Sequence, residues 1–281
     1  CWKAFIRQDF LQYYRYTQKW VDLFDEEPYM VGIESAHYIK GMHNLMGSQF
    51  NLGNYQKLNA TLKDFEKFCN SKIVLQNHNN LIQCFIYHTI SQLNKHFLTG
   101  NFSDGLLLVE GIEEKLKEYE IYLDRHRILV IYYKIASMYF GTGNYETAID
   151  YLNKIINWKV DLRNDLQCYA RLLHLIAHYE LGNYQLLEYL AKSVYRFMAK
   201  MQNLSVVAEE MFKFLRKALT LNARQLKPEF EKLLGKLKQF ENKRFETRAF
   251  MYLDMISWLE SKINNVPVQK LIQKKYLSKK Q

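Results

Sequence analysis

The stretch "GTGNYETAIDYLNKI", residues 141–155, decides the fold, because its Gly-Asn-aromatic centre recurs three more times along the chain. The looser copies are "FNLGNYQKL" at 50–58, "FLTGNFSDG" at 97–105 and "YELGNYQLL" at 179–187. The four central glycines are Gly53, Gly100, Gly143 and Gly182. Their spacings of 47, 43 and 39 residues fall in the range of roughly 20–50 residues that is typical of stacked repeats.

The copy at 141–155 lies between two apolar runs with helical spacing. Before the glycine, apolar residues recur at i, i+3, i+4 and i+7, namely Tyr132, Ile135, Ala136 and Tyr139. After it, the same spacing continues through Ala148, Leu152 and Ile155. Glycine takes the left-handed conformation that ends one helix, and asparagine starts the next. One such pair buries only part of its apolar surface, so we expect neighbouring pairs to bury the rest.

The third copy resembles the tetratricopeptide repeat (TPR) family. That family's order is large, apolar, small and aromatic, then a turn glycine and an aromatic, then alanine. The matching residues here are Tyr132, Ile135, Ala136, Tyr139, Gly143, Tyr145 and Ala148. The other copies diverge, and all spacings exceed the family's roughly 34 residues. The resemblance implies an all-α fold, a right-handed solenoid of about five or six antiparallel helix pairs.

The composition agrees with an all-helical protein. The chain has 281 residues, 48% of them hydrophobic, with only three prolines and eleven glycines, too few for many strands joined by Gly/Pro turns. No long polar linker divides it, so we predict a single TPR-like domain over residues 1–281. Because it begins at Cys1 without methionine, we expect it to be part of a longer protein.

Apolar periodicity and turn residues set the expected helices. Pro228 is expected in the first turn of its helix, and the turn aromatics Tyr55, Phe102, Tyr145 and Tyr184 are expected to pack between helices. The helices are expected near 2–24, 31–51, 54–70, 79–98, 103–121, 124–141, 145–158, 163–181, 184–201, 204–221, 227–241, 244–263 and 267–277.

The cysteines indicate a reducing compartment. They are Cys1, Cys69, Cys84 and Cys168, far apart and without a CxxC pair, which argues against a zinc site and against a disulfide framework. We therefore predict a cytoplasmic protein. No apolar run approaches the roughly 18 residues that cross a bilayer, so we predict no membrane insertion.

Two pairs of residues have spacings that catalysis or metal binding would use. Cys84 and His88 lie one helical turn apart, as a nucleophile and its base would, but their neighbours are mostly apolar and favour packing. His174 and His178 have the i, i+4 spacing of two metal ligands, yet two ligands do not complete a site. No GxxxxGK[ST], GxGxxG, HExxH or GxSxG motif occurs. We predict no enzymatic activity, no cofactor and no metal.

The resemblance also implies a binding surface. In the TPR family the first helix of each pair lines a concave groove whose polar residues hold extended or helical peptides. Asparagine suits this because its side chain both donates and accepts hydrogen bonds. The corresponding positions here are Lys40, His43, Asn44, Asn94, Tyr133, Ser137 and Tyr169. They predict a non-enzymatic scaffold that binds a peptide or protein; the open alternative is that they are solvated or packed against the next repeat.

Positive charge gathers in the last third of the chain. Residues 192–281 hold 20 lysines and arginines against eight acidic residues, whereas residues 1–191 hold 19 against 21. The predicted basic patch is Lys232, Lys236, Lys238, Lys243, Arg244, Arg248, Lys274 and Lys275. It indicates either a solvated polar end or an acidic partner.

Nucleic acid is the weaker candidate for that partner, because lysine outnumbers arginine in the patch. The alternative function is nevertheless a regulatory helical-repeat module of a larger nucleic-acid-associated protein, with its basic C-terminal third against an acidic partner.

Overall fold

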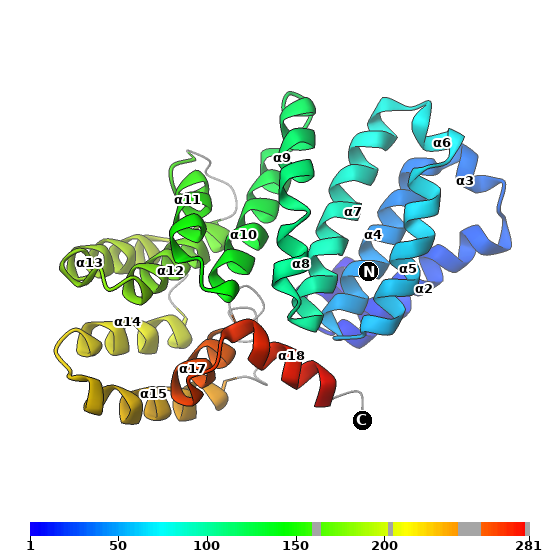
Figure 1. The fold of residues 1–281 in the computed structure, drawn as a ribbon. Helices are drawn as coiled ribbons and strands as arrows, with labels where there is room; N and C mark the ends of the chain where they lie inside the picture. The colour runs from blue at the N-terminus through cyan, green and yellow to red at the C-terminus, as the bar shows by residue number, and fades with distance from the viewer. Residues whose placement is uncertain (159–163, 202–204, 241–253, 279–281) are drawn as a thin grey trace. The chain divides into compact units, whose positions relative to one another are not determined.

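The computed structural model describes residues 1–158, 164–201, 205–240 and 254–278, and over these ranges the chain forms helices and no strand (Figure 1). The expected all-α class is therefore confirmed. The helices gather in two compact units, Cys1–Arg127 and Ile128–Gln281. Their boundary falls inside α10 (Arg125–Thr142).

The first unit stacks helices that follow one another in sequence. Its elements before α10 are α1 (Trp2–Ile6), α2 (Phe10–Glu26), α3 (Met30–Ile33), α4 (Ser35–Asn51), α5 (Tyr55–Cys69), α6 (Lys72–Leu75), α7 (His78–Thr99), α8 (Phe102–Leu106) and α9 (Val109–Glu118). Helix α4 packs against α2, α5 and α7, and is the centre of the unit.

The second unit contains the best copy of the repeat. Beyond α10 its elements are α11 (Tyr145–Ile156), α12 (Asn164–Glu180), α13 (Tyr184–Lys200), α14 (Val206–Ala218), α15 (Ala223–Lys238), α17 (Met255–Asn264) and α18 (Val268–Ser278). Contacts follow the chain from α11 to α15, and α17 packs against α15 and α18.

The four turn glycines adopt the conformation that the repeat predicts. Gly53, Gly100, Gly143 and Gly182 have φ of 65°, 66°, 88° and 73°, the left-handed region that glycine enters without steric cost. Asn54 and Asn144 accept hydrogen bonds from the backbone N–H three residues on, which caps α5 and α11.

The turn aromatics are not equally packed. Phe102 is buried and Tyr55 and Tyr145 are half-buried, whereas Tyr184 is 54% exposed. The expectation that Tyr184 would pack between helices is therefore wrong. Its ring centroid lies 6.1 Å from that of Tyr179 on the preceding helix, but the residue remains exposed.

A close helix contact organises the first unit. Thr17 of α2 and Ser48 of α4 share a buried hydrogen bond of 3.0 Å, and the backbone of Gly41 lies under the ring of Trp20, where a Cβ would come within 3.1 Å of Cδ1. Small residues on α4 therefore let α2 approach it closely.

An aromatic cluster organises the second unit. Trp258 of α17 is almost completely buried. Its ring centroid lies 5.8 Å from that of Phe230 and 6.4 Å from those of Phe214 and Tyr179. Edge contacts of this kind add to the area that the rings bury, and here they join α12, α14, α15 and α17.

Several expected boundaries are wrong. The helix expected at 31–51 is divided at Glu34 into α3 and α4. The helix expected at 2–24 breaks at Gln8, where φ is 55°, and Asp9 then caps α2 by accepting from the backbone N–H of Gln12. The helix expected at 103–121 is divided into α8 and α9. Helix α15 starts at Ala223 rather than near Pro228, because Asn222 and Gln225 form a capping box.

Candidate functional site

Most of the predicted groove residues are buried in the helix packing. Asn44 and Asn94 lie on α4 and α7, whose faces are covered by each other and by α2 or α5. Ser137 donates its hydroxyl proton to the carbonyl oxygen of Tyr133, 2.8 Å away on the preceding turn. Buried side chains offer a partner little surface. The five buried residues are Asn44, Asn94, Tyr133, Ser137 and Tyr169.

Lys40 and His43 are half-buried and lie together over one aromatic ring. The imidazole of His43 stacks on Tyr87 with ring centroids 3.9 Å apart, and Lys40 Nζ lies 5.4 Å from the same ring centroid. Burial, with Arg127 and Lys40 nearby, holds the pKa of His43 well below its usual value. In this cluster the Tyr87 ring is covered by His43 and by the Lys40 cation. The peptide-binding role of Lys40 and His43 stays a prediction.

Three residues of the predicted basic patch, Lys243, Arg244 and Arg248, lie outside the described residues. Of the others, Lys236 Nζ is 2.5 Å from Glu210 Oε2. Lys232 and Lys274 are exposed. The described part of the patch is thus less positive than its sequence indicates, since carboxylates neutralise some of its lysines.

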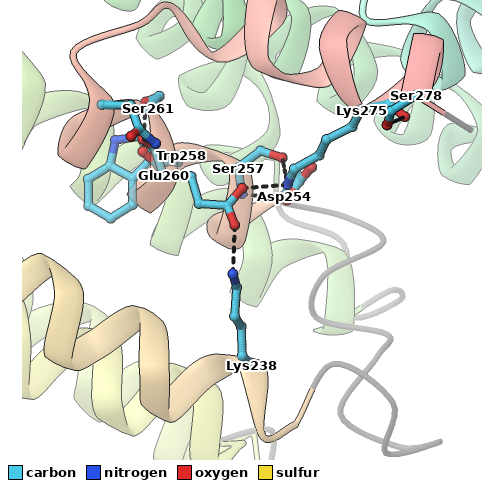
Figure 2. A network of polar contacts seen from close by, with 9 residues as sticks. Lys238, Asp254, Ser257, Trp258, Glu260, Ser261, Lys275 and Ser278 are labelled. Atoms are coloured by element: carbon cyan, nitrogen blue, oxygen red, sulfur yellow. Dashed lines mark hydrogen bonds and ion pairs between the residues drawn. The ribbon is translucent and has the colours of Figure 1, made fainter.

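Glu260 neutralises two more of the lysines, as Figure 2 shows. Lys238 Nζ lies 2.9 Å from its Oε1, and Lys275 Nζ lies 2.7 Å from its Oε2 and 2.8 Å from Ser257 Oγ. Burial acts to raise the pKa of Glu260, but the hydrogen bonds from Lys275 and Lys238 outweigh it and lower that pKa. The network ties α15 and α18 to α17.

Cys84 and His88 lack the features of a nucleophile and its base. A hydrogen bond with Cys69 and burial both raise the pKa of the Cys84 thiol, so the thiol stays protonated and unreactive. Burial lowers the pKa of His88, and its Nε2 is buried without a hydrogen-bond partner among the described residues. The surroundings of Cys84 and His88 therefore fit a role in packing better than a role in catalysis.

His174 and His178 are in contact, with ring centroids 4.5 Å apart. Burial, aided by His178 and Arg171, lowers the pKa of His174 to about 4. The amide of Asn183 lies 3.0 Å from His178 Nδ1. Over the described ranges no three His, Cys, Asp or Glu residues gather closely enough to hold a metal ion.

A cleft between α13 and α14 is the candidate site that the sequence reasoning missed. Its volume is about 440 Å³, within the roughly 300–1,000 Å³ of ligand pockets. Ala191 and Phe212 are buried at its floor, and the half-exposed ring of Tyr195 contacts Phe212 edge to face at 5.7 Å. The lining residues are Ala191, Lys192, Tyr195, Arg196, Glu209, Phe212, Lys213 and Arg216.

The rim of this cleft carries four cations and one carboxylate. Lys192 pairs with Glu188 and Lys213 with Glu210, each at 2.8 Å and each within one helix. Neither Arg196 nor Arg216 pairs with a carboxylate of the described residues; Arg196 Nε donates to the carbonyl oxygen of Lys192 at 3.2 Å. Two guanidinium groups therefore flank an apolar floor without a direct ion pair, although the charge of Arg216 also acts on Glu188.

Part of the cleft can be recognised from the sequence. Lys192 and Arg196 lie at i, i+4 on α13, and Lys213 and Arg216 at i, i+3 on α14, spacings that place each pair on one helix face. Tyr195 and Phe212 have core spacing, and periodicity alone does not reveal that the Tyr195 ring is 46% exposed.

The described helices include none with the length and apolar character needed to cross a bilayer. The chain matches no family model, no curated protein and no solved structure.

Proposed function

We propose that the chain is a non-enzymatic helical-repeat scaffold, TPR-like with right-handed stacking, that binds a protein partner. The observation that carries this proposal is the α13–α14 cleft, with its aromatic floor and arginine rim. Exposed tyrosine and arginine around a desolvated centre are the residues that dominate binding energy in protein interfaces. The four glycine turns with left-handed φ support the repeat assignment.

The chemistry of the remaining polar residues supports a binding role rather than catalysis. Catalysis needs a nucleophile or base whose pKa is tuned toward its task and whose atoms are accessible. Burial and the hydrogen bond with Cys69 instead raise the pKa of the Cys84 thiol. The four cysteines are free thiols, which favours the reducing cytoplasm as the location.

The proposal is tested by capture with the full chain. The tagged protein is used to isolate partners under native conditions, each candidate is identified by mass spectrometry, and direct binding is then measured by calorimetry with the purified partner. A protein that binds with a Kd of about 10 μM or tighter supports the proposal. The absence of any directly binding protein, or turnover of a substrate by the chain, overturns it.

An oligonucleotide titration tests the alternative function. Nucleic acid held through several phosphates binds with an affinity that falls steeply as salt rises. The pairing of Lys236, Lys238 and Lys275 with carboxylates leaves fewer cations for phosphates. We expect at most weak, sequence-independent binding that disappears at moderate salt; tight and selective binding would replace the scaffold proposal.

A further inference from the structure

We infer that the cleft between α13 and α14 binds an acidic segment of the protein partner, with one aromatic or aliphatic side chain of that segment inserted beside Tyr195. This inference rests on the proposed function and specifies its site and the chemistry of its partner. It places the site on the second helix of one pair and the first helix of the next, away from the groove positions suggested by the family resemblance.

The floor of the cleft selects an apolar side chain. Ala191 and Phe212 close it from below, and the ring of Tyr195 stands at its edge with nearly half of its surface exposed. An apolar side chain placed there removes this exposed ring from water and gains about 25 cal/mol for each Å² buried. Tyrosine also loses little conformational entropy when it is covered, since few of its bonds rotate.

The cations at the rim select negative charge on either side of the inserted apolar side chain. Arg196 lies on α13 and Arg216 on α14, so their guanidinium groups approach the cleft from opposite walls. Among the described lining residues Glu209 is the one acid. Because Glu188 and Glu210 neutralise Lys192 and Lys213, the small positive excess of the rim comes from the two arginines. Guanidinium binds carboxylate through two parallel hydrogen bonds. Arg196 donates to a backbone carbonyl, and Arg216 acts on the Glu188 carboxylate by charge, without an ion pair between them among the described residues.

Nucleic acid fits this cleft less well than an acidic peptide. Single strands bind along rows of aromatic rings that stack successive bases, whereas one exposed ring, that of Tyr195, lines this cleft. Glu209 at the rim would also repel a continuous run of phosphates. A peptide can place its carboxylates at the two arginines and leave Glu209 free.

The test measures fluorescence anisotropy with the full chain and a labelled synthetic peptide rich in Glu and Asp around a central Phe. We expect saturable binding that weakens roughly tenfold or more in the double variant Arg196→Glu, Arg216→Glu. Tyr195→Ser should weaken it several-fold through lost packing. The matched control is Arg224→Glu, Lys227→Glu, which makes the same charge change on exposed positions of α15 outside the cleft and should preserve binding.

Further measurements separate the cleft from general charge attraction. A peptide in which Phe is replaced by Ser should bind roughly tenfold more weakly; equal binding overturns the inference. Equal loss in the cleft variant and the control variant overturns it too, as does tighter binding of a labelled oligonucleotide that competes for the cleft. Circular dichroism and the thermal midpoint test whether each variant is folded. We expect folded variants, because the substitutions lie on exposed positions.

The native partner distinguishes failure of this inference from failure of the proposed function. If a captured protein binds the wild type and the Arg196→Glu, Arg216→Glu variant equally, the site assigned here is wrong and the scaffold function stands. If no protein binds the wild type directly, the scaffold function is wrong. Loss of a captured partner in the cleft variant, with retention in the control variant, supports both.

Discussion

The indole Nε1 of Trp258 donates a hydrogen bond of 2.5 Å to Oε1 of Glu180, and Lys262 Nζ lies 2.8 Å from the other carboxylate oxygen. The Glu180 side chain is almost fully buried. It joins the end of α12 to α17 by satisfying a buried N–H and a cation together. An acceptor with these two roles is costly to remove, because the Trp258 N–H would lose its partner in a site closed to water.

We therefore expect Glu180→Ala to lower the free energy of unfolding by about 1–3 kcal/mol. Glu180→Gln should lose less, since its amide oxygen still accepts from Trp258. Chemical denaturation followed by tryptophan fluorescence and circular dichroism measures both. Glu188→Ala is the control, because its ion pair with Lys192 is exposed and should contribute about 0.5 kcal/mol or less. Equal stability of Glu180→Ala and wild type would contradict the role assigned to this carboxylate.

Gly143→Ala should destabilise the protein through backbone strain alone. Its φ is 88°, and a Cβ there would meet no atom within 4 Å. An L-residue in the left-handed region costs roughly 1–2 kcal/mol. The control is Gly235→Ala inside α15, where a Cβ also meets nothing and where alanine should stabilise the helix by roughly 0.5–1 kcal/mol. The midpoint of thermal unfolding should fall for Gly143→Ala and rise for Gly235→Ala. A shift in the same direction for both variants would argue against a left-handed turn at Gly143.

The decrease in the free energy of unfolding at acid pH should depend on His174. Burial lowers its pKa in the folded protein to about 4, against about 6.5 in an unfolded chain. The unfolded state therefore binds a proton first, so the stability present above pH 6.5 is lost as the pH falls toward 4, by about 3 kcal/mol at most. His174→Gln should flatten this part of the profile when unfolding is measured between pH 7 and pH 4. An unchanged slope would show that His174 is not held neutral by its surroundings.

The four cysteines should differ in their rate of alkylation. Cys84 and Cys168 are buried, whereas Cys1 and Cys69 are half-exposed, and a hydrogen bond with Cys69 and burial raise the pKa of the Cys84 thiol. Because the thiolate reacts with iodoacetamide, peptide mass spectrometry should find Cys84 and Cys168 modified last in the folded protein. All four should react together in denaturant. Early modification of Cys84 would mean that its helix opens readily.

The sequence predicted the turns better than it predicted the surfaces. Gly143 and its three counterparts were identified correctly because a left-handed helix end is a local requirement that one residue type meets. The capping box of Asn222 and Gln225 is also a local signal, and it overrides the preference of Pro228 for the first turn of a helix. Exposure is different: Tyr195 has the spacing of a core residue and Asn44 that of a groove residue, yet the packing of other helices leaves Tyr195 half-exposed and buries Asn44.

The aromatic cluster around Trp258 has a consequence for the order of folding. Helices of the first unit contact partners that are near in sequence, such as α2 with α4 and α4 with α5, so that unit can grow by successive local steps. Glu180 and Trp258 are 78 residues apart, and closing so long a loop costs entropy before any contact repays it. Before α17 packs, the rings of Tyr179, Phe214 and Phe230 lack their shared contact with Trp258. The second unit should therefore complete its core late, and its incomplete form should be the one that aggregates or is cleaved.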